Sequence, residues 1–273
     1  MRVKMTEDRL LCGCNAAGAG SGIQGGRPGP GFTLIELLVV VAIMGILAAL
    51  LLPALDGGRL KTKRIACQSN LRQLALSVQM YCADNEARFP ENRPGGDSPN
   101  IWVRGDLKQA RDATNQAIIA QSKLFPYAAH AATFRCPADA SQASGFPRVR
   151  SYSMNSWAGS RYMETAYPNA KFRTFVRESE LATVGAANIW LIQDEHEASI
   201  DDAWFVVTMD DSQPFANYPA TRHAHAYNSN FGDGHVEFTS LRDPESQQFG
   251  QRHQWFSARN LDWVRLKQAT TVQ

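Results

Sequence analysis

Surplus charge is scarce in this sequence. Residues 1–31 carry four basic and two acidic side chains, which account for the whole formal charge of +2, and residues 32–273 are neutral overall. A nucleic-acid-binding domain usually shows a basic patch or stripe. The charge distribution therefore predicts no nucleic-acid partner.

Cysteine is also scarce, with five in 273 residues. Cys12 and Cys14 form at most half a metal site, because neither a second pair nor a histidine lies near them. Cys67 and Cys82, if they share one helix, lie about 22 Å apart, whereas a disulfide needs Cα atoms within about 7 Å. Any bridge among the three downstream cysteines therefore uses Cys136, and reduced buried thiols are the alternative.

Catalytic motifs and internal repeats are both missing from the sequence. No pattern supplies a nucleophile or an activated water, so we predict that the chain is not an enzyme. Several side chains in the second half have the chemistry of zinc or iron ligands. They are Asp194, Glu195, His196, His223, His225, Asp233 and His235. His223 and His225 would face the same way on a strand.

The simplest interpretation of these side chains is structural: Asp233 serves a turn, and the histidines cap loops or face solvent. We therefore predict no cofactor, with metal binding by a set drawn from Asp194, His196, His223 and His235 as the alternative. Calcium is a second alternative, although its four candidate carboxylates lack the spacing of a calcium loop. They are Asp201, Asp202, Asp210 and Asp211.

One long apolar run dominates what the sequence does contain. Residues 32–55 would form a helix of roughly 36 Å, enough to cross a bilayer core of about 30 Å. A secretory signal peptide has an apolar core of only about 7–15 residues, so the run predicts a membrane helix. Glu36 is its single charge. Because a carboxylate inside a membrane is costly, Glu36 is a functional candidate.

The same helix is predicted to continue to about Asn85. Apolar residues recur beyond the membrane run at intervals of mostly three and four, which gives one buried stripe. They are Leu60, Cys67, Leu71, Leu74, Val78 and Tyr81. Pro53 is predicted to kink the helix. Basic residues flank the membrane run about equally on both sides, so the positive-inside rule does not assign an orientation.

The remaining sequence predicts an α+β domain of short strands and loops. Strands are expected at 101–103, 188–192 and 203–208, and a helix over 116–125 is expected to stop at Pro126. The domain organisation is then a Gly- and Pro-rich leader and a long helix in two halves, followed by a globular domain. Its boundaries are 1–31, 32–55, 56–86 and 87–273.

A hairpin is the clearest local prediction in the globular domain. Asp233-Gly234 suits a two-residue type I′ turn, in which both central residues need positive φ. That turn places Phe231 opposite Val236, and Ser229 opposite Phe238. One face of the hairpin would then be apolar and the other solvated. The apolar set is Tyr227, Phe231, Val236 and Phe238, and the polar set is Asn228, Asn230, His235 and Glu237.

Gly31-Phe32-Thr33-Leu34-Ile35-Glu36, followed by the apolar run, resembles the signal of bacterial type IV prepilins and type II secretion pseudopilins. The resemblance implies a pilin-like fold, with a long membrane helix packed on an antiparallel sheet. It also implies that a prepilin peptidase cuts between Gly31 and Phe32 and methylates the new amino group of Phe32. Glu36 matches the carboxylate that pairs with a neighbouring subunit's amino terminus during assembly, and Pro53 matches the helix-kinking proline.

The globular part resembles a pseudopilin-like family of Planctomycetes and Verrucomicrobia. Its hallmark is a histidine, nine residues, then Asp-Gly, which here is His223 followed by Asp233-Gly234. Four further segments carry the resemblance. They are 67–73, 134–139, 151–155 and 194–196. A leader of 31 residues is longer than the short basic leader usual in the family.

These observations predict a structural subunit of a type II secretion-like or type IV pilus-like filament. The expected partners are prepilin peptidase, other pseudopilin subunits and the inner membrane, with the globular domain in the periplasm or at the cell surface. The alternative is a membrane-anchored ligand-binding or adhesive domain that does not polymerise. Glu36 distinguishes the two, because a simple anchor has no use for a charge at that position.

Overall fold

The computed structural model describes residues 31–273 except 96–97, 169–170, 211–214 and 250–258. The predicted leader up to residue 30, with Cys12 and Cys14, lies outside the described residues. The chain divides into two compact units, Met1–Leu52 and Pro53–Gln273, which are described separately below.

Helix α1 (Leu34–Asp84) is 51 residues long, and this confirms the predicted long helix. It is the one helix among the described residues that is long and apolar enough to cross a membrane. The predicted stripe is buried from Cys67 onward, whereas Leu60 is 52% exposed because no part of the globular domain covers it. The helix continues through Pro53, and the kink there stays a prediction.

A five-stranded sheet forms the centre of the second unit, in the order β5-β3-β4-β6-β7. The strands are β3 (Tyr152–Asn155), β4 (Trp190–Asp194), β5 (Trp204–Phe205), β6 (Ala226–Phe231) and β7 (Val236–Ser240). Neighbouring strands are antiparallel except β3 and β5, which are parallel. A separate small hairpin joins β1 (Gln142–Ala143) to β2 (Phe146–Pro147). The predicted α+β class is confirmed.

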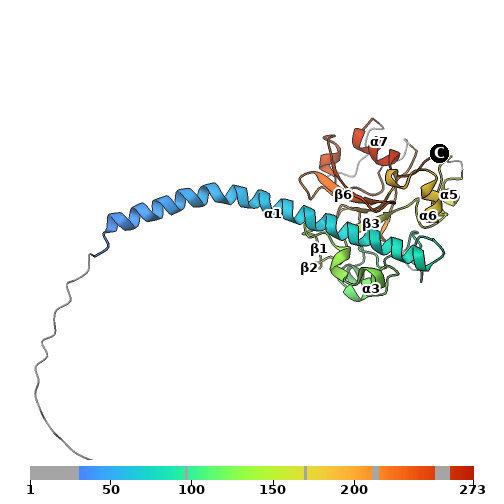
Figure 1. The fold of residues 1–273 in the computed structure, drawn as a ribbon, viewed down its shortest axis with the longest axis horizontal. Coiled ribbons are helices and arrows are strands. Elements are labelled where there is room, and N and C mark those ends of the chain that lie inside the picture. Colours follow the sequence, from blue (N-terminus) through green and yellow to red (C-terminus); the bar gives the residue numbers. More distant parts are fainter. Residues whose placement is uncertain (1–30, 96–97, 169–170, 211–214, 250–258) are drawn as a thin grey trace, which may run out of the picture. The chain divides into compact units, whose positions relative to one another are not determined.

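Helices cover both faces of this sheet within the second unit (Figure 1). The second half of α1 packs on one face, where Cys67, Leu71 and Leu74 share a core with residues of β3 and β4. Helix α7 (Leu261–Gln268) packs on the other face, where Trp263 joins a second core with Tyr227. As a result, every residue of β3, β4 and β6 is buried.

Short helices complete the second unit. They are α2 (Ala110–Ala113), α3 (Gln116–Ala120), α4 (Phe125–Ala128), α5 (Tyr162–Ala166) and α6 (Glu178–Ala182), with 3-10 turns η1 (Ala131–Phe134), η2 (Ala186–Asn188) and η3 (Ser246–Gln248). The single helix expected over 116–125 is wrong. Pro126 lies in the first turn of α4 and does not stop a helix, because proline is tolerated at that position.

The strand predictions are correct in part. The buried strand expected at 188–192 is β4, shifted by two residues because Asn188 belongs to η2. The strand expected at 203–208 shortens to β5. Residues 101–103 are buried but form only a single bridge, between Ile101 and Glu91. Their apolar composition reflects burial and not strand pairing, so the prediction of a strand at 101–103 was wrong.

The hairpin prediction has the right elements and the wrong register. Phe231 and His235 pair around a three-residue loop, since the Phe231 N–H donates to the His235 carbonyl at 3.0 Å. Only Gly234 in this loop has positive φ, at 90°, and Asp233 instead accepts the His235 N–H at 3.1 Å. One loop residue more than predicted places Asn228 opposite Phe238 and Asn230 opposite Val236.

This shift changes the faces of the hairpin. Val236 and Phe238 share the α1 face with Asn228 and Asn230, whereas Tyr227 and Phe231 belong to the core beneath α7. Neither face of β6 is solvated, because helices cover both sides of the sheet. The two asparagines predicted to be wet are fully buried.

Candidate functional site

The first candidate site is the start of α1. Thr33 and Glu36 form a reciprocal capping arrangement: the Thr33 N–H and hydroxyl each donate to Glu36 Oε2 at 2.8 Å, and the Glu36 N–H donates to Thr33 Oγ1 at 3.3 Å. Gly31 and Phe32 precede the helix without regular secondary structure, and Phe32 is 71% exposed. The carboxylate therefore already has local donors.

The apolar surface that follows Glu36 has no cover within the described residues of the first unit. Its large apolar side chains range from 42% exposed at Val40 to 76% exposed at Leu34. Burying each such side chain is worth about 1.5–3 kcal/mol. A membrane or an apolar partner must therefore surround this half of α1.

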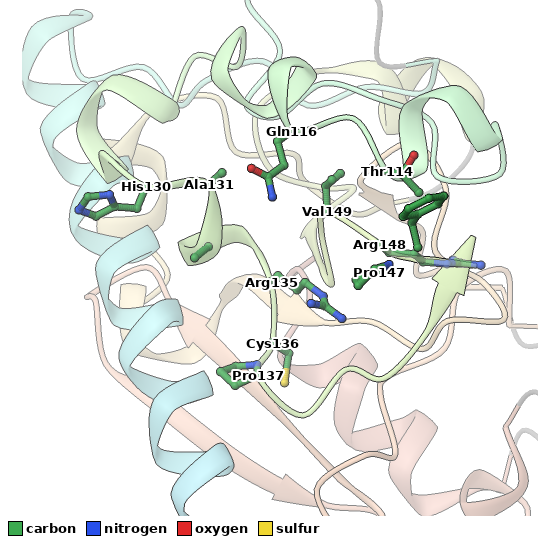
Figure 2. A pocket seen from close by; sticks show the side chains of 12 residues that line it. Thr114, Gln116, His130, Ala131, Arg135, Cys136, Pro137, Pro147, Arg148 and Val149 are labelled. Atoms are coloured by element: carbon green, nitrogen blue, oxygen red, sulfur yellow. The ribbon is translucent and has the colours of Figure 1, made fainter. Parts of the chain in front are cut away.

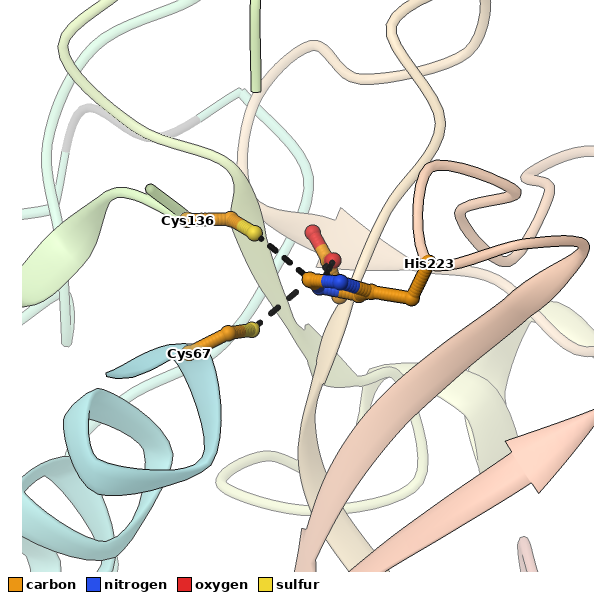
Figure 3. A group of neighbouring side chains, drawn as sticks. Cys67, Cys136 and His223 are labelled. Carbon is orange, nitrogen blue, oxygen red and sulfur yellow. Dashed lines mark hydrogen bonds and ion pairs between the residues drawn. The ribbon is translucent and has the colours of Figure 1, made fainter. Parts of the chain in front are cut away.

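The second candidate site is a buried cluster in the second unit, shown in Figure 3. Four ligand-type side chains converge so that one atom of each lies within 4.8 Å of the others. This cysteine–histidine cluster consists of Cys67, Cys136, Asp194 and His223. Cys136 Sγ lies 3.2 Å from His223 Nε2, and Cys67 Sγ lies 3.9 Å from Asp194 Oδ2. Asp194 Oδ2 is also 3.4 Å from His223 Nε2.

Different elements supply the four side chains of the cysteine–histidine cluster. Cys67 lies on α1 at the start of its buried stripe, and Cys136 follows η1. Asp194 is the last residue of β4, and His223 lies in the turn that precedes β6. All four are at most 5% exposed. The cluster therefore lies where α1 meets the sheet.

Outer groups hold the cluster in position. Arg222 donates to Asp194 Oδ1, so Oδ2 remains for the cluster, and it also lies 4.0 Å from Asp139. The Tyr152 hydroxyl donates to Cys67 Sγ at 3.2 Å. Burial alone lowers the pKa of Arg222, but Asp194 and Asp139 outweigh it and raise that pKa. Arg222 is therefore a permanent positive charge against the cluster.

The cluster does not have the arrangement of a catalytic triad. In a triad the carboxylate binds the imidazole nitrogen opposite the one that faces the nucleophile. Here Cys136 Sγ and Asp194 Oδ2 both contact the same nitrogen, His223 Nε2. Burial also raises the pKa of the Cys136 thiol far above its usual range, whereas a nucleophilic cysteine needs a lowered pKa.

The pKa of His223 is raised despite its burial. Burial alone lowers it, but hydrogen bonds with Asp194 and Cys136 prevail and bring it to about 9. His196 shows the opposite outcome, because burial lowers its pKa and its Nδ1 accepts the Ala198 N–H at 3.1 Å. His196 is therefore a neutral loop-capping residue.

The structure separates most of the side chains that the sequence suggested as ligands. Asp194 and His223 do meet. His235 instead contacts Asp233 at 2.6 Å in the exposed hairpin loop, which agrees with a turn role for Asp233. His225 does not face the same way as His223, because it is exposed in a turn with φ of 55°. The alternative set that included His196 and His235 is thus replaced by one with two cysteines.

The calcium alternative finds no support among the described residues. Asp201 is paired with Lys108 Nζ at 2.6 Å, and Asp202 accepts the Gly95 N–H at 2.8 Å. Asp211 lies outside the described residues. The remaining carboxylate considered for calcium, Asp210, is not part of the buried metal-type group.

Sequence reasoning missed Cys67 and Cys136 as members of a site. Treating them as disulfide candidates or inert thiols was sound for residues so far apart in the chain. Each cysteine lies within a segment that resembles the same family, Cys67 in 67–73 and Cys136 in 134–139. That shared resemblance was the available signal, and the fold was needed to bring the segments together.

A surface cavity of about 750 Å³ lies beside Cys136, between α3, η1 and the β1–β2 hairpin (Figure 2). Arg135 and Arg148 supply its positive charge. Their guanidinium groups already donate to the carbonyls of Asp139, at 2.7 Å, and Glu197, at 3.2 Å. Both arginine side chains that line the cavity are therefore already hydrogen-bonded within the chain.

Comparison with known proteins adds to the geometry of the first site. Residues 30–52 match the family model described as the prokaryotic N-terminal methylation motif. The chain carries this methylation motif. It covers Gly31, Phe32 and Glu36, together with most of the exposed apolar half of α1. No solved structure matches the chain.

Curated relatives match between about a quarter and a third of the chain. Type II secretion system core protein G of Pectobacterium carotovorum subsp. carotovorum is 36% identical over 91 residues, which are 33% of this chain and 54% of the relative. The protein of the same name from Klebsiella michiganensis is 43% identical over 65 residues, 24% of this chain and 45% of the relative. Type IV major pilin protein PilE1 of Neisseria gonorrhoeae is 36% identical over 96 residues, 34% of this chain and 44% of the relative. The chain spans about half the length of the curated relatives it matches, and its fold is pilin-like.

Proposed function

We propose that this chain is a pseudopilin, a structural subunit of a type II secretion-like or type IV pilus-like filament. In this proposal prepilin peptidase cuts after Gly31 and methylates Phe32. The first half of α1 holds the precursor in the inner membrane and later packs against the same segment of neighbouring subunits. The globular domain then lies in the periplasm or at the cell surface. The role is structural and not enzymatic.

The observation that carries the proposal is a methylation motif on the exposed apolar half of α1, in which Glu36 is the one carboxylate. Lipid alone would satisfy the apolar side chains, but lipid gives no reason to keep a charge at Glu36. A neighbouring amino terminus does give such a reason, since two charges removed from water are tolerated when they pair. The printed names of the relatives, secretion and pilin proteins, agree with this role.

We further propose that the globular domain belongs to the family marked by His223 and Asp233-Gly234. The motif spans β6 from end to end: His223 precedes the strand and joins the cysteine–histidine cluster. Gly234 follows the strand, and a Cβ there would lie 3.0 Å from Gln79 Nε2 of α1. The motif thus suits a domain in which both ends of β6 abut the long helix.

The charge of Glu36 is tested by replacing it with glutamine and with alanine. Glu36→Gln retains an oxygen that accepts the Thr33 donors, because glutamine serves the same capping role. Glu36→Ala removes both the charge and the acceptor for the Thr33 donors. We expect both variants to insert into the membrane and both to be absent from sheared filaments, as measured by fractionation and immunoblotting.

Thr33→Ala is the matched control, because it removes the capping hydroxyl and keeps the charge. It should be incorporated nearly as wild type. Normal incorporation of Glu36→Gln would contradict the pseudopilin proposal and favour a membrane-anchored binding domain that never polymerises.

A further inference from the structure

We propose that the cysteine–histidine cluster binds one zinc ion, which fastens α1 to the sheet of the globular domain. The inference is independent of the pseudopilin proposal. It begins from distances within the cluster, 3.2 Å from Cys136 Sγ to His223 Nε2, and 3.4 Å and 3.9 Å from Asp194 Oδ2 to His223 Nε2 and Cys67 Sγ. Tetrahedral zinc with bonds of about 2.0–2.3 Å places its ligand atoms about 3.3–3.8 Å apart. Three of the six distances among these atoms are close to that range, and the other three are at most 4.8 Å.

Hydrogen bonding alone does not account for this convergence. His223 Nε2 carries either one hydrogen or one lone pair, so it can satisfy only one partner well. Both Cys136 Sγ and Asp194 Oδ2 nevertheless approach it. A cation at the centre gives each of the four atoms the same partner and removes the competition.

The charges of the surrounding groups fit a divalent ion. With both thiols deprotonated, the cluster has three negative charges, from Cys67, Cys136 and Asp194. A divalent ion and the Arg222 guanidinium, which binds the outer oxygen of Asp194, neutralise all three. The Tyr152 hydroxyl adds a donor to Cys67 Sγ. Outer partners of this kind orient metal ligands and set their affinity.

The ligand set selects zinc and a structural role. Two sulfurs with one imidazole and one carboxylate suit zinc, whereas calcium and magnesium take oxygen ligands. The protein supplies all four ligands, each at most 5% exposed, which leaves no open position for a substrate. The ion would join residue 67 of α1 to three segments of the sheet domain.

The experiment uses the full chain, purified in detergent under reducing conditions, and measures bound metal by mass spectrometry and cobalt(II) binding by absorption. We expect one zinc per chain and, after exchange, the visible bands of tetrahedral cobalt with a thiolate charge-transfer band. Cys67→Ser and Cys136→Ser should each weaken cobalt binding by more than about 100-fold, because changes to outer partners alone cost about 10–100-fold.

Cys82→Ser is the matched control, since Cys82 is fully buried on the same helix and lies outside the cluster. It should bind metal as wild type does. The cobalt titration of the wild-type chain decides the matter even if a ligand variant fails to fold. The proposal is overturned if the reduced wild type binds no zinc or cobalt. The proposal is also overturned if the purified chain holds a Cys67–Cys136 disulfide and binds no cobalt once that disulfide has been reduced.

Discussion

At the residue scale, the second unit keeps buried charges by pairing each with fixed partners. Arg150 is fully buried, and its guanidinium donates to the carbonyls of Tyr152, at 2.7 Å, and Asp201, at 2.6 Å. Burial lowers the pKa of Arg150 to about 10, so it stays charged at neutral pH. A buried charge without such hydrogen bonds would cost far more free energy than one that has them.

Glu180 allows a pH-dependent test of this principle. Burial alone raises its pKa, but the N–H groups of Val176 and Arg177 and the side chain of Arg161 prevail and hold it below the ordinary 4.5. A lowered native pKa means that the stabilisation is complete above about pH 4.5 and is lost as pH falls through the native pKa. Glu180→Gln should lower the free energy of unfolding by about 1 kcal/mol at pH 7.

The difference in free energy of unfolding between wild type and Glu180→Gln should become smaller as the pH falls below about 4.5. Urea unfolding followed by tryptophan fluorescence measures it. Glu86→Gln is the control, because Glu86 is 80% exposed and its ion pairs are 3.8 Å long. If this difference in free energy of unfolding stayed constant down to pH 3, the charge of Glu180 would not be the source of the stabilisation.

At the element scale, β6 is held between α1 and α7, and Asn230 joins it to two neighbours. Its Nδ2 donates to the Leu71 carbonyl of α1, and its Oδ1 accepts the Ile192 N–H of β4, both at 2.9 Å. The Leu71 carbonyl lies inside α1 and accepts Asn230 as a second donor, since a carbonyl has two lone pairs. Asn230 therefore helps to set the position of the helix along the sheet.

Asn230→Ala should destabilise the domain by about 1–3 kcal/mol, because it leaves the buried Ile192 N–H without a partner. The Leu71 carbonyl loses its second donor and keeps its hydrogen bond within the helix. Asn228→Ala is the matched control on the same strand and face. The Asn228 amide has no protein hydrogen bond within the described part of the chain, so its loss should cost clearly less. Urea unfolding of the two variants measures the difference, and equal losses would refute the linking role of Asn230.

Local patterns predicted the elements better than their pairing. The 3.6-residue periodicity was enough for α1, because residues one turn apart necessarily share a face. The hairpin register failed because Asp-Gly suits both a two-residue loop and a three-residue loop with glycine last. A shift of one residue moved Val236 and Phe238 to the face of the hairpin that carries Asn228 and Asn230. Nothing local indicated that helices cover both sides of the sheet.

At the scale of the whole molecule, the buried core begins only at Cys67. Residues 32–52 are all exposed, so an apolar environment must cover them. The sequence predicted this division from apolar length alone. The cysteine–histidine cluster could not be predicted in that way, because its members are separated by at least 29 residues and only the folded topology joins them.

Processing gives a prediction for the whole chain. In cells that contain prepilin peptidase, we expect the intact mass of the protein to correspond to a chain that begins at Phe32 and carries one added methyl group. Gly31 and Phe32 are exposed and have no regular secondary structure, so the chain there is accessible to a protease. Cells without the peptidase supply the control, in which the leader remains. A leader still attached in peptidase-containing cells would contradict the processing step.

The capping arrangement at the start of α1 bears on how a subunit could leave a filament. The donors on Thr33 are three residues from Glu36, so they return to the carboxylate as soon as a neighbour's amino group withdraws. Detachment then exchanges one set of hydrogen-bond donors on the Glu36 carboxylate for another. A filament built on this contact would be reversible, with a membrane pool of subunits ready for reuse.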